Sequence, residues 1–199
     1  MPLILGIDPG SLVCGYGLVQ ADGTRLSCVE AGVLTAPAGW TKYARLAEIG
    51  KEIVAILGEH AVDAVALEAG FIVTFKSKTT GDPYNQQGAL VSAAARGMAG
   101  YIAAARGIQV FEYAPTMVKK SITGQGKAEK AQVARAVQLR LGMKAQPEPD
   151  AGDALAIAIC HAMQLVIGRA APAGVELRRR EEAETAEAPP SPAGMHALS

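Results

Sequence analysis

An apolar run near the N-terminus, Leu3-Ile4-Leu5-Gly6-Ile7-Asp8-Pro9-Gly10, predicts a buried strand that ends in a carboxylate. Apolar residues on both faces of so short a run are typical of a strand covered on both sides. Because Pro9 cannot continue a central ladder, the strand is expected to end at Asp8. Asp is seldom buried unless it is paired or binds a metal, although Asp8 could also begin a turn with Pro9 and Gly10.

The next segments place a second carboxylate beside the first. Strands are predicted at 13–19 and 25–34, joined by the turn residues Asp22-Gly23, and the glycines of the first would leave room beside Asp8 for another backbone or a ligand. A helix from Lys42 to Leu57, with Gly58 as its C-cap, leads to a strand at 61–68 that ends in Glu68. A crossover helix predicts that this strand runs parallel to the first, so that Asp8 and Glu68 lie at one sheet edge.

The remaining periodicity completes an α/β fold. Helices are predicted at 86–106, 115–121, 127–141 and 150–169, with a strand at 108–112. The expected architecture is a five-stranded mixed sheet with helices on both faces, formed by residues 1–169. Residues 170–199 are rich in Pro, Ala and Glu, a composition that predicts a disordered tail.

Composition restricts the compartment and the class of partner. The chain has 199 residues, and its three cysteines lack metal-binding spacing, which favours a reducing cytoplasm. We expect no signal peptide and no membrane span, because no apolar run reaches about 18 residues. The formal net charge is zero, yet residues 115–140 hold six basic residues against Glu129 alone: Lys119, Lys120, Lys127, Lys130, Arg135 and Arg140. Such local charge matters more than the sum for binding a polyanion.

Residues 70–84 break all periodicity and combine aromatic with basic side chains. Phe71, Phe75, Lys76 and Lys78 fall in this loop. Exposed aromatics beside lysines suit stacking on unpaired bases with phosphates nearby. A hydrophobic loop folded onto its own core is the equal alternative.

Two more carboxylates, Asp150 and Asp153, stand three residues apart in the first turn of the last predicted helix, and so share a face. N-terminal capping would explain Asp150 well and Asp153 less well. If that helix end meets the edge with Asp8 and Glu68, four carboxylates converge, and they cannot all stay ionised without a cation. Oxygen ligands favour Mg²⁺ or Mn²⁺, and a pair of such ions suits phosphodiester hydrolysis.

In their order along the chain, these residues resemble the RuvC family of Holliday junction resolvases, which have the ribonuclease H-like fold. The resemblance covers residues 1 to about 168 and is carried by the segments 6–10, 15–17, 67–68, 111–113, 118–119, 124–133 and 150–158. The loop between Glu68 and Arg96 is longer than the family form, and the tail carries no family motif.

The resemblance implies a homodimeric endonuclease that depends on Mg²⁺ or Mn²⁺, with two ions expected per subunit, and that nicks two strands of like polarity across a four-way DNA junction. Asp8, Glu68, Asp150 and Asp153 fall on the family's metal-binding catalytic acids. Lys119 and Lys130 fall on basic residues linked to DNA binding and catalysis, and Phe71 on an aromatic near the junction centre. A junction-binding and branch-migration helicase complex, RuvAB-like, is the implied partner.

Three other classes share parts of this pattern. An actin-like ATPase or sugar kinase lobe would use Asp8-Pro9-Gly10 as a phosphate loop, but that class needs two lobes. A junction-binding scaffold would carry the same acids as structural groups, and a relative acting on RNA would use the same backbone chemistry. ATP binding, magnesium-dependent cleavage and substrate preference discriminate among these classes, since one fold hosts many functions.

Overall fold

The computed structural model describes residues 1–70 and 86–168. The predicted tail at 170–199 lies outside the described residues, and so does the predicted loop at 70–84 apart from Gly70. Four residues named above as DNA contacts, Phe71, Phe75, Lys76 and Lys78, belong to that loop.

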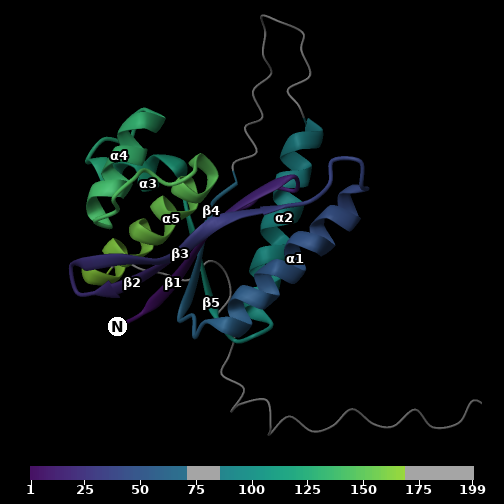
Figure 1. Cartoon of the computed structure of the whole chain (residues 1–199), viewed down its shortest axis with the longest axis horizontal. Helices are drawn as coiled ribbons and strands as arrows, with labels where there is room; N and C mark the ends of the chain where they lie inside the picture. The colour runs from purple at the N-terminus through teal and green to yellow at the C-terminus, as the bar shows by residue number, and fades with distance from the viewer. Residues whose placement is uncertain (71–85, 169–199) are drawn as a thin grey trace, which may run out of the picture.

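The described chain forms the expected alternation of strands and helices (Figure 1). The strands are β1 (Leu3–Asp8), β2 (Val13–Asp22), β3 (Arg25–Thr35), β4 (Ala64–Glu68) and β5 (Gln109–Tyr113). The helices are α1 (Lys42–Glu59), α2 (Gln86–Ala104), α3 (Pro115–Thr123), α4 (Lys130–Arg140) and α5 (Pro149–Val166).

One mixed sheet of five strands has the order β3-β2-β1-β4-β5. β1 pairs antiparallel with β2, while β1, β4 and β5 run parallel to one another. The predicted parallel pairing of β1 with β4 is therefore confirmed, with Ile7 opposite Leu67. The two carboxylates that follow these residues, Asp8 and Glu68, end neighbouring strands at one edge of the sheet.

The sheet lies between two helical layers, as predicted (Figure 1). α1 and α2 cover one face, where Leu5, Ile7 and Leu67 join their apolar core. α3, α4 and α5 cover the other, where Ile4 and Ala66 join a second core. Since side chains alternate along a strand, the even-numbered positions of β1 and β4, including Asp8 and Glu68, face α5. No helix in the described part of the chain is long and apolar enough to cross a bilayer.

Glycines allow α5 to approach the sheet closely. A Cβ on Gly6 would collide with the carbonyl oxygen of Ala154, and one on Gly15 with that of Asp150. The space left beside Asp8 is thus filled by another backbone, one of the two occupants predicted. The N-terminal part of α5, which carries Asp150 and Asp153, is therefore held against β1 and β2.

Several predicted boundaries differ from the structure. α1 continues through Gly58 to Glu59 and is capped by His60, so the prediction of Gly58 as the cap is wrong. The predicted helix at 127–141 begins only at Lys130, because Glu129 and Gln132 form a capping box there. α5 begins at Pro149, so that Asp150 alone, without Asp153, occupies its first turn.

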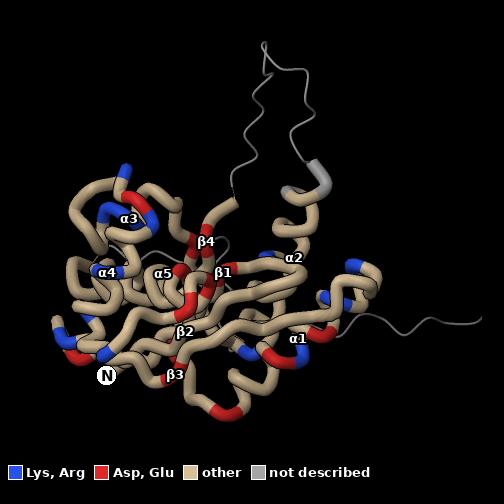
Figure 2. Tube along the Cα trace, turned by 45° about the horizontal axis from the view of Figure 1, so that its top comes forward, with Lys and Arg blue, Asp and Glu red and all other residues tan. Residues whose placement is uncertain are grey.

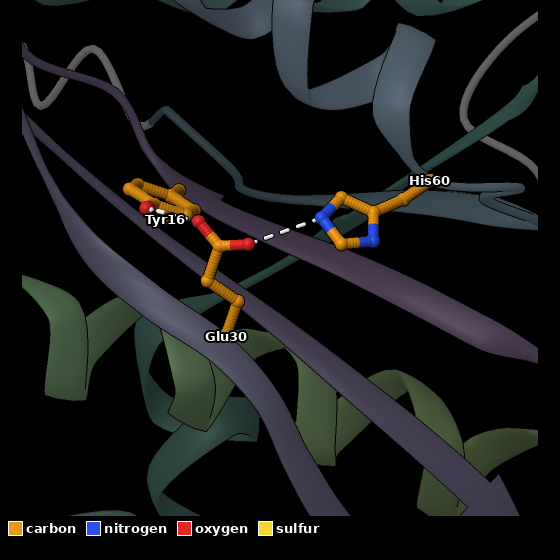
Figure 3. Close-up of polar contacts among 3 residues, drawn as sticks. All are labelled: Tyr16, Glu30 and His60. Carbon is orange, nitrogen blue, oxygen red and sulfur yellow. Dashed lines mark hydrogen bonds and ion pairs between the residues drawn. The ribbon is translucent and has the colours of Figure 1, made fainter.

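A polar contact ties the C-terminal end of α1 to the strands beneath it (Figure 3). Glu30 of β3 accepts a 2.7 Å hydrogen bond from the hydroxyl of Tyr16 on β2, and its other oxygen lies 3.0 Å from Nε2 of His60. Hydrogen bonds from these two groups keep the pKa of Glu30 below its usual value. His60 thus caps α1 and joins its C-terminal end to β3.

Candidate active site

Three carboxylates from separate parts of the chain meet at the edge where β1 ends. Asp8, Asp150 and Asp153 each place an oxygen within 4.8 Å of the others. All three are partly exposed, so a ligand can reach them from solvent. Glu68 completes the predicted set from the neighbouring strand and lines the same cavity as Asp8 and Asp153.

That cavity has a volume of about 310 Å³ and combines acids with bases. Lys119 of α3 and Lys130 of α4 line it together with the carboxylates. Apolar side chains, Val118 and Val133 among them, form the rest of the wall. Figure 2 shows red acidic segments where β1 and β4 end, on the side of the sheet that carries α3 with its blue basic segments.

Crowding changes the proton affinity of the acids. Burial, followed by the neighbouring charges of Glu68, Asp153 and Asp150, raises the pKa of Asp8 from 3.8 to about 6. The pKa of Glu68 is also raised, first by burial and then by Asp153. Such shifts cluster at functional sites, where a cation or a proton must relieve the repulsion.

One lysine already balances part of this charge. Lys130 Nζ lies 3.3 Å from Asp153 Oδ2, and its side chain is 82% exposed. The pKa of Lys130 is raised, chiefly by Asp153. An ammonium group that is solvent-exposed and anchored to one acid remains free to meet a phosphate.

The other described lysines of the predicted basic stretch lie outside the cavity. Lys120 on α3 and Lys127 before α4 are exposed. Lys119 is partly buried, which agrees with its place in the cavity wall. The structure thus separates two cavity lysines from the surface lysines around them.

The donor set fits a hard divalent cation. The three carboxylates, whose oxygens lie within 4.8 Å of one another, provide oxygen ligands alone. His60 and His161 bind other groups, Glu30 and Tyr113 respectively. His161 is buried in the core, where its Nδ1 lies 2.7 Å from the hydroxyl of Tyr113. The arrangement favours Mg²⁺-type over Zn²⁺-type binding, as the residue types predicted.

Two residues at this edge had no signal in the sequence. Arg96 Nε of α2 donates a 2.8 Å hydrogen bond to the carbonyl of Glu68, and Ser92 Oγ donates one of 3.3 Å to the carbonyl of Pro9. Both belong to an Ala-rich helix, where the sequence does not distinguish a polar residue that contacts the protein from one that faces solvent. Only the packing of α2 on the sheet shows which carbonyls they reach.

Comparisons with known proteins identify the family of the chain. The family model "Crossover junction endodeoxyribonuclease RuvC" matches residues 4–161. A RuvC of Rubrobacter xylanophilus is 40% identical over 161 residues, covering 80% of this chain and 84% of its own. One of Heliobacterium modesticaldum is 40% identical over 167 residues, covering 83% and 97% respectively.

Two solved structures of RuvC proteins have a fold similar to that of this chain. Thermus thermophilus RuvC in complex with Holliday junction substrate has a TM-score of 0.77 at 29% identity, covering 87% of this chain and 100% of that one. A second structure of Thermus thermophilus RuvC has a TM-score of 0.73 at 28% identity, covering 86% and 99%.

Fold, acidic edge and neighbouring lysines together define a nuclease of the ribonuclease H-like class. Within that class, the chain belongs to the RuvC family of crossover junction endodeoxyribonucleases. The family and fold inferred from the ordered motifs are thereby confirmed.

Proposed function

We propose that this protein resolves four-way DNA junctions by paired symmetric nicks, through divalent-metal-dependent hydrolysis of phosphodiester bonds, in homologous recombination and repair. One observation carries the proposal: Asp8, Glu68, Asp153, Lys119 and Lys130 line a single open cavity at the sheet edge. Anionic groups that can hold a cation, next to cations that can hold a phosphate, are what hydrolysis of a phosphodiester requires.

The four carboxylates Asp8, Glu68, Asp150 and Asp153 would hold Mg²⁺ or Mn²⁺, with two ions expected per subunit. When bound, such ions make water a nucleophile at neutral pH and stabilise the oxygen that leaves. The protein's own contribution is to fix these acids on the ends of β1 and β4 and on α5. The raised pKa of Asp8 is the cost of that arrangement in the absence of a cation.

Lysines place the DNA strand against the acids. Lys130 serves at the reacting phosphate, because it is anchored to Asp153 and still exposed. Lys119, which lines the same cavity, holds the same strand, while the exposed Lys120 and Lys127 contact phosphates farther along. The roles of Phe71, Phe75, Lys76 and Lys78 stay predictions from the sequence.

Two nicks of like polarity need two active sites with matched orientation, which a homodimer supplies by its two-fold axis. The dimer and a RuvAB-like helicase complex as partner rest on the family resemblance, and a cytoplasmic location on the cysteine content. The division into a nuclease unit at 1–169 and a separate segment at 170–199 rests on the resemblance for the first part and on composition for the second, which lies outside the described residues.

The test is incubation of the protein with a synthetic four-way junction, with and without Mg²⁺ or Mn²⁺. Linear duplex that appears only with metal is the expected product. Junction binding without cleavage under all metal conditions would instead support a scaffold. ATP binding in place of junction binding would support the actin-like lobe, and faster cleavage of branched RNA would favour an RNA substrate.

A further inference from the structure

One face of α2 binds the main chain at the points where the two acid-bearing strands end. Arg96 Nε donates to the carbonyl oxygen of Glu68 at 2.8 Å, and Ser92 Oγ donates to that of Pro9 at 3.3 Å. Pro9 directly follows Asp8. Because Ser92 and Arg96 are four residues apart on a helix, they share a face and act from one rigid element.

Arg96 reaches Glu68 from the face of the sheet opposite its carboxylate. Arg96 lines a cavity of about 400 Å³ between α2 and β5, together with Leu67 and Tyr101. The Glu68 carboxylate lines the other cavity, with Asp8 and Asp153. The hydrogen bond of Arg96 therefore goes to the backbone of the acid and leaves its carboxylate oxygens free for a ligand.

The main chain at the end of β4 is held by the sheet on one side and by Arg96 on the other. Glu68 pairs with Tyr113 of β5, and the amide of Ala69 donates to the carbonyl of Tyr113 at 2.9 Å. A hydrogen bond from a charged donor is stronger than an ordinary amide bond. The absence of a side chain at Gly70 leaves room for Arg96, since a Cβ there would overlap its guanidinium.

We propose that Ser92 and Arg96 are positioning residues that set the distance between Asp8 and Glu68 by clamping the ends of β1 and β4 to α2. The proposal rests on the proposed function, in which these two acids share a divalent cation. It adds two residues outside the carboxylate cluster, which bind the main-chain carbonyls of Glu68 and of Pro9.

Arg96→Ala and Ser92→Ala, singly and combined, test the clamp. Three quantities are measured for each variant: the cleavage rate at saturating junction, the junction Kd, and the Mn²⁺ affinity of the DNA-free protein by calorimetry. Removing groups that orient metal ligands typically costs about 10- to 100-fold in metal affinity or activity. We expect such losses in rate and in Mn²⁺ affinity for Arg96→Ala, smaller ones for Ser92→Ala, and a junction Kd within about twofold of the wild type.

Conservative and control variants separate positioning from general stability. Arg96→Lys keeps a charged donor and should recover part of the rate, while Gly70→Ala, which displaces the guanidinium, should reproduce the loss. Arg106→Ala is the matched control, because Arg106 also donates to a carbonyl, that of Ile102 at 3.2 Å, at the far end of α2. It should leave the rate and the Mn²⁺ affinity unchanged.

Unchanged rate and Mn²⁺ affinity in Arg96→Ala would overturn the clamp. So would a loss that follows the melting temperature and the junction Kd and is not recovered by Arg96→Lys. Glu68→Gln shows which proposal has failed. If Glu68→Gln abolishes cleavage and Arg96→Ala does not alter it, the clamp alone is wrong; if Glu68→Gln cleaves normally, the proposed function of the acid is wrong.

Discussion

At the residue scale, Asp8 has an environment that packing alone does not explain. It ends a buried central strand and faces three other acids, which together with burial raise its pKa to about 6. A turn residue gains nothing from such neighbours. The unfavourable free energy of ionising Asp8 among these acids is consistent with a role in binding a cation.

Asp8→Asn should abolish cleavage while junction binding persists, because Asn keeps the shape and removes the charge. The several kcal/mol that a bound ion contributes correspond to a loss of more than about a hundredfold in rate. Asp63→Asn is a matched control. Asp63 immediately precedes β4 and accepts a 2.7 Å hydrogen bond from the amide of Leu3, at the start of β1 and away from Asp8. Near-normal cleavage by Asp8→Asn would mean that Asp8 is a turn residue.

The same variant has a pH-dependent effect on stability, measured with a chelator present. A group whose folded-state pKa is raised stabilises the fold below its unfolded pKa and loses that contribution as pH rises through the folded value. For Asp8 this window runs from 3.8 to about 6. Urea unfolding should therefore show Asp8→Asn gaining stability over the wild type above pH 6, and losing that advantage near pH 4. A constant difference at all pH values would contradict the raised pKa.

Lysines in the cavity should contribute to the salt dependence of junction binding. Each phosphate neutralised on duplex DNA adds about 0.9 to the slope of log affinity against log salt. Lys119→Ala and Lys130→Ala should each lower affinity and flatten the slope by about that amount. The control is Lys51→Ala on α1, which is 73% exposed and paired with Glu48 at 3.0 Å. Slopes equal to the wild type in both cavity variants would remove these lysines from the DNA surface.

At the scale of elements, the site depends on how closely α5 can approach the sheet. Because Gly15 has no side chain, the carbonyl of Asp150 can lie against β2. Gly6 likewise lets the carbonyl of Ala154, one turn later on α5, lie against β1. Two acids three residues apart can meet Asp8 only because the helix that carries them is held this near.

Gly15→Ala should lower stability by about 1–3 kcal/mol, the usual cost of overpacking, and should weaken cleavage beyond that. Gly58→Ala is its counterpart, because Gly58 lies inside α1 with nothing within 4 Å of an added Cβ. This second change should stabilise the fold by about 0.5–1 kcal/mol, since Ala is the better helix residue. Thermal unfolding of the two variants measures both effects. Equal melting temperatures would show that α5 can move away from β2 without loss.

At the scale of the whole molecule, His161 links the core to pH. It is a fully buried residue of α5, and its ring centroid lies 4.2 Å from that of Phe111 on β5. Its Nε2 has no hydrogen-bond partner in the described part of the chain. Burial lowers the pKa of His161 to about 4, because the charged ring would lose its hydration in the core.

The core should therefore loosen in mild acid. Between pH 6.5 and about 4 the unfolded chain binds the proton and the folded chain does not, so stability falls as pH falls. At 1.36 kcal/mol per pKa unit, the loss from this group reaches about 3 kcal/mol. Urea unfolding of the wild type and His161→Gln at pH 7 and pH 4.5 isolates it. A pH dependence shared equally by both proteins would assign the acid sensitivity to other groups.

The sequence by itself determined the elements, their order and the identity of the acids. The spacing of apolar residues, the turn residues and the short connections are signals between residues close together in the sequence. For this reason β1, the β2–β3 hairpin and the parallel β4 could be predicted from the chain. The convergence of Asp8 and Glu68 followed from topology, since neighbouring parallel strands end at one edge.

Only the tertiary structure decided how closely the acids approach and what holds them there. The contacts of Arg96 and Ser92 with the main chain join residues 28 and 83 positions apart, and no local pattern encodes such pairs. The partition of the lysines, with Lys119 and Lys130 in the cavity and Lys120 and Lys127 outside, likewise depends on how α3 and α4 pack on α5. Packing fixes distances between elements, whereas sequence periodicity fixes only which side of each element faces inward.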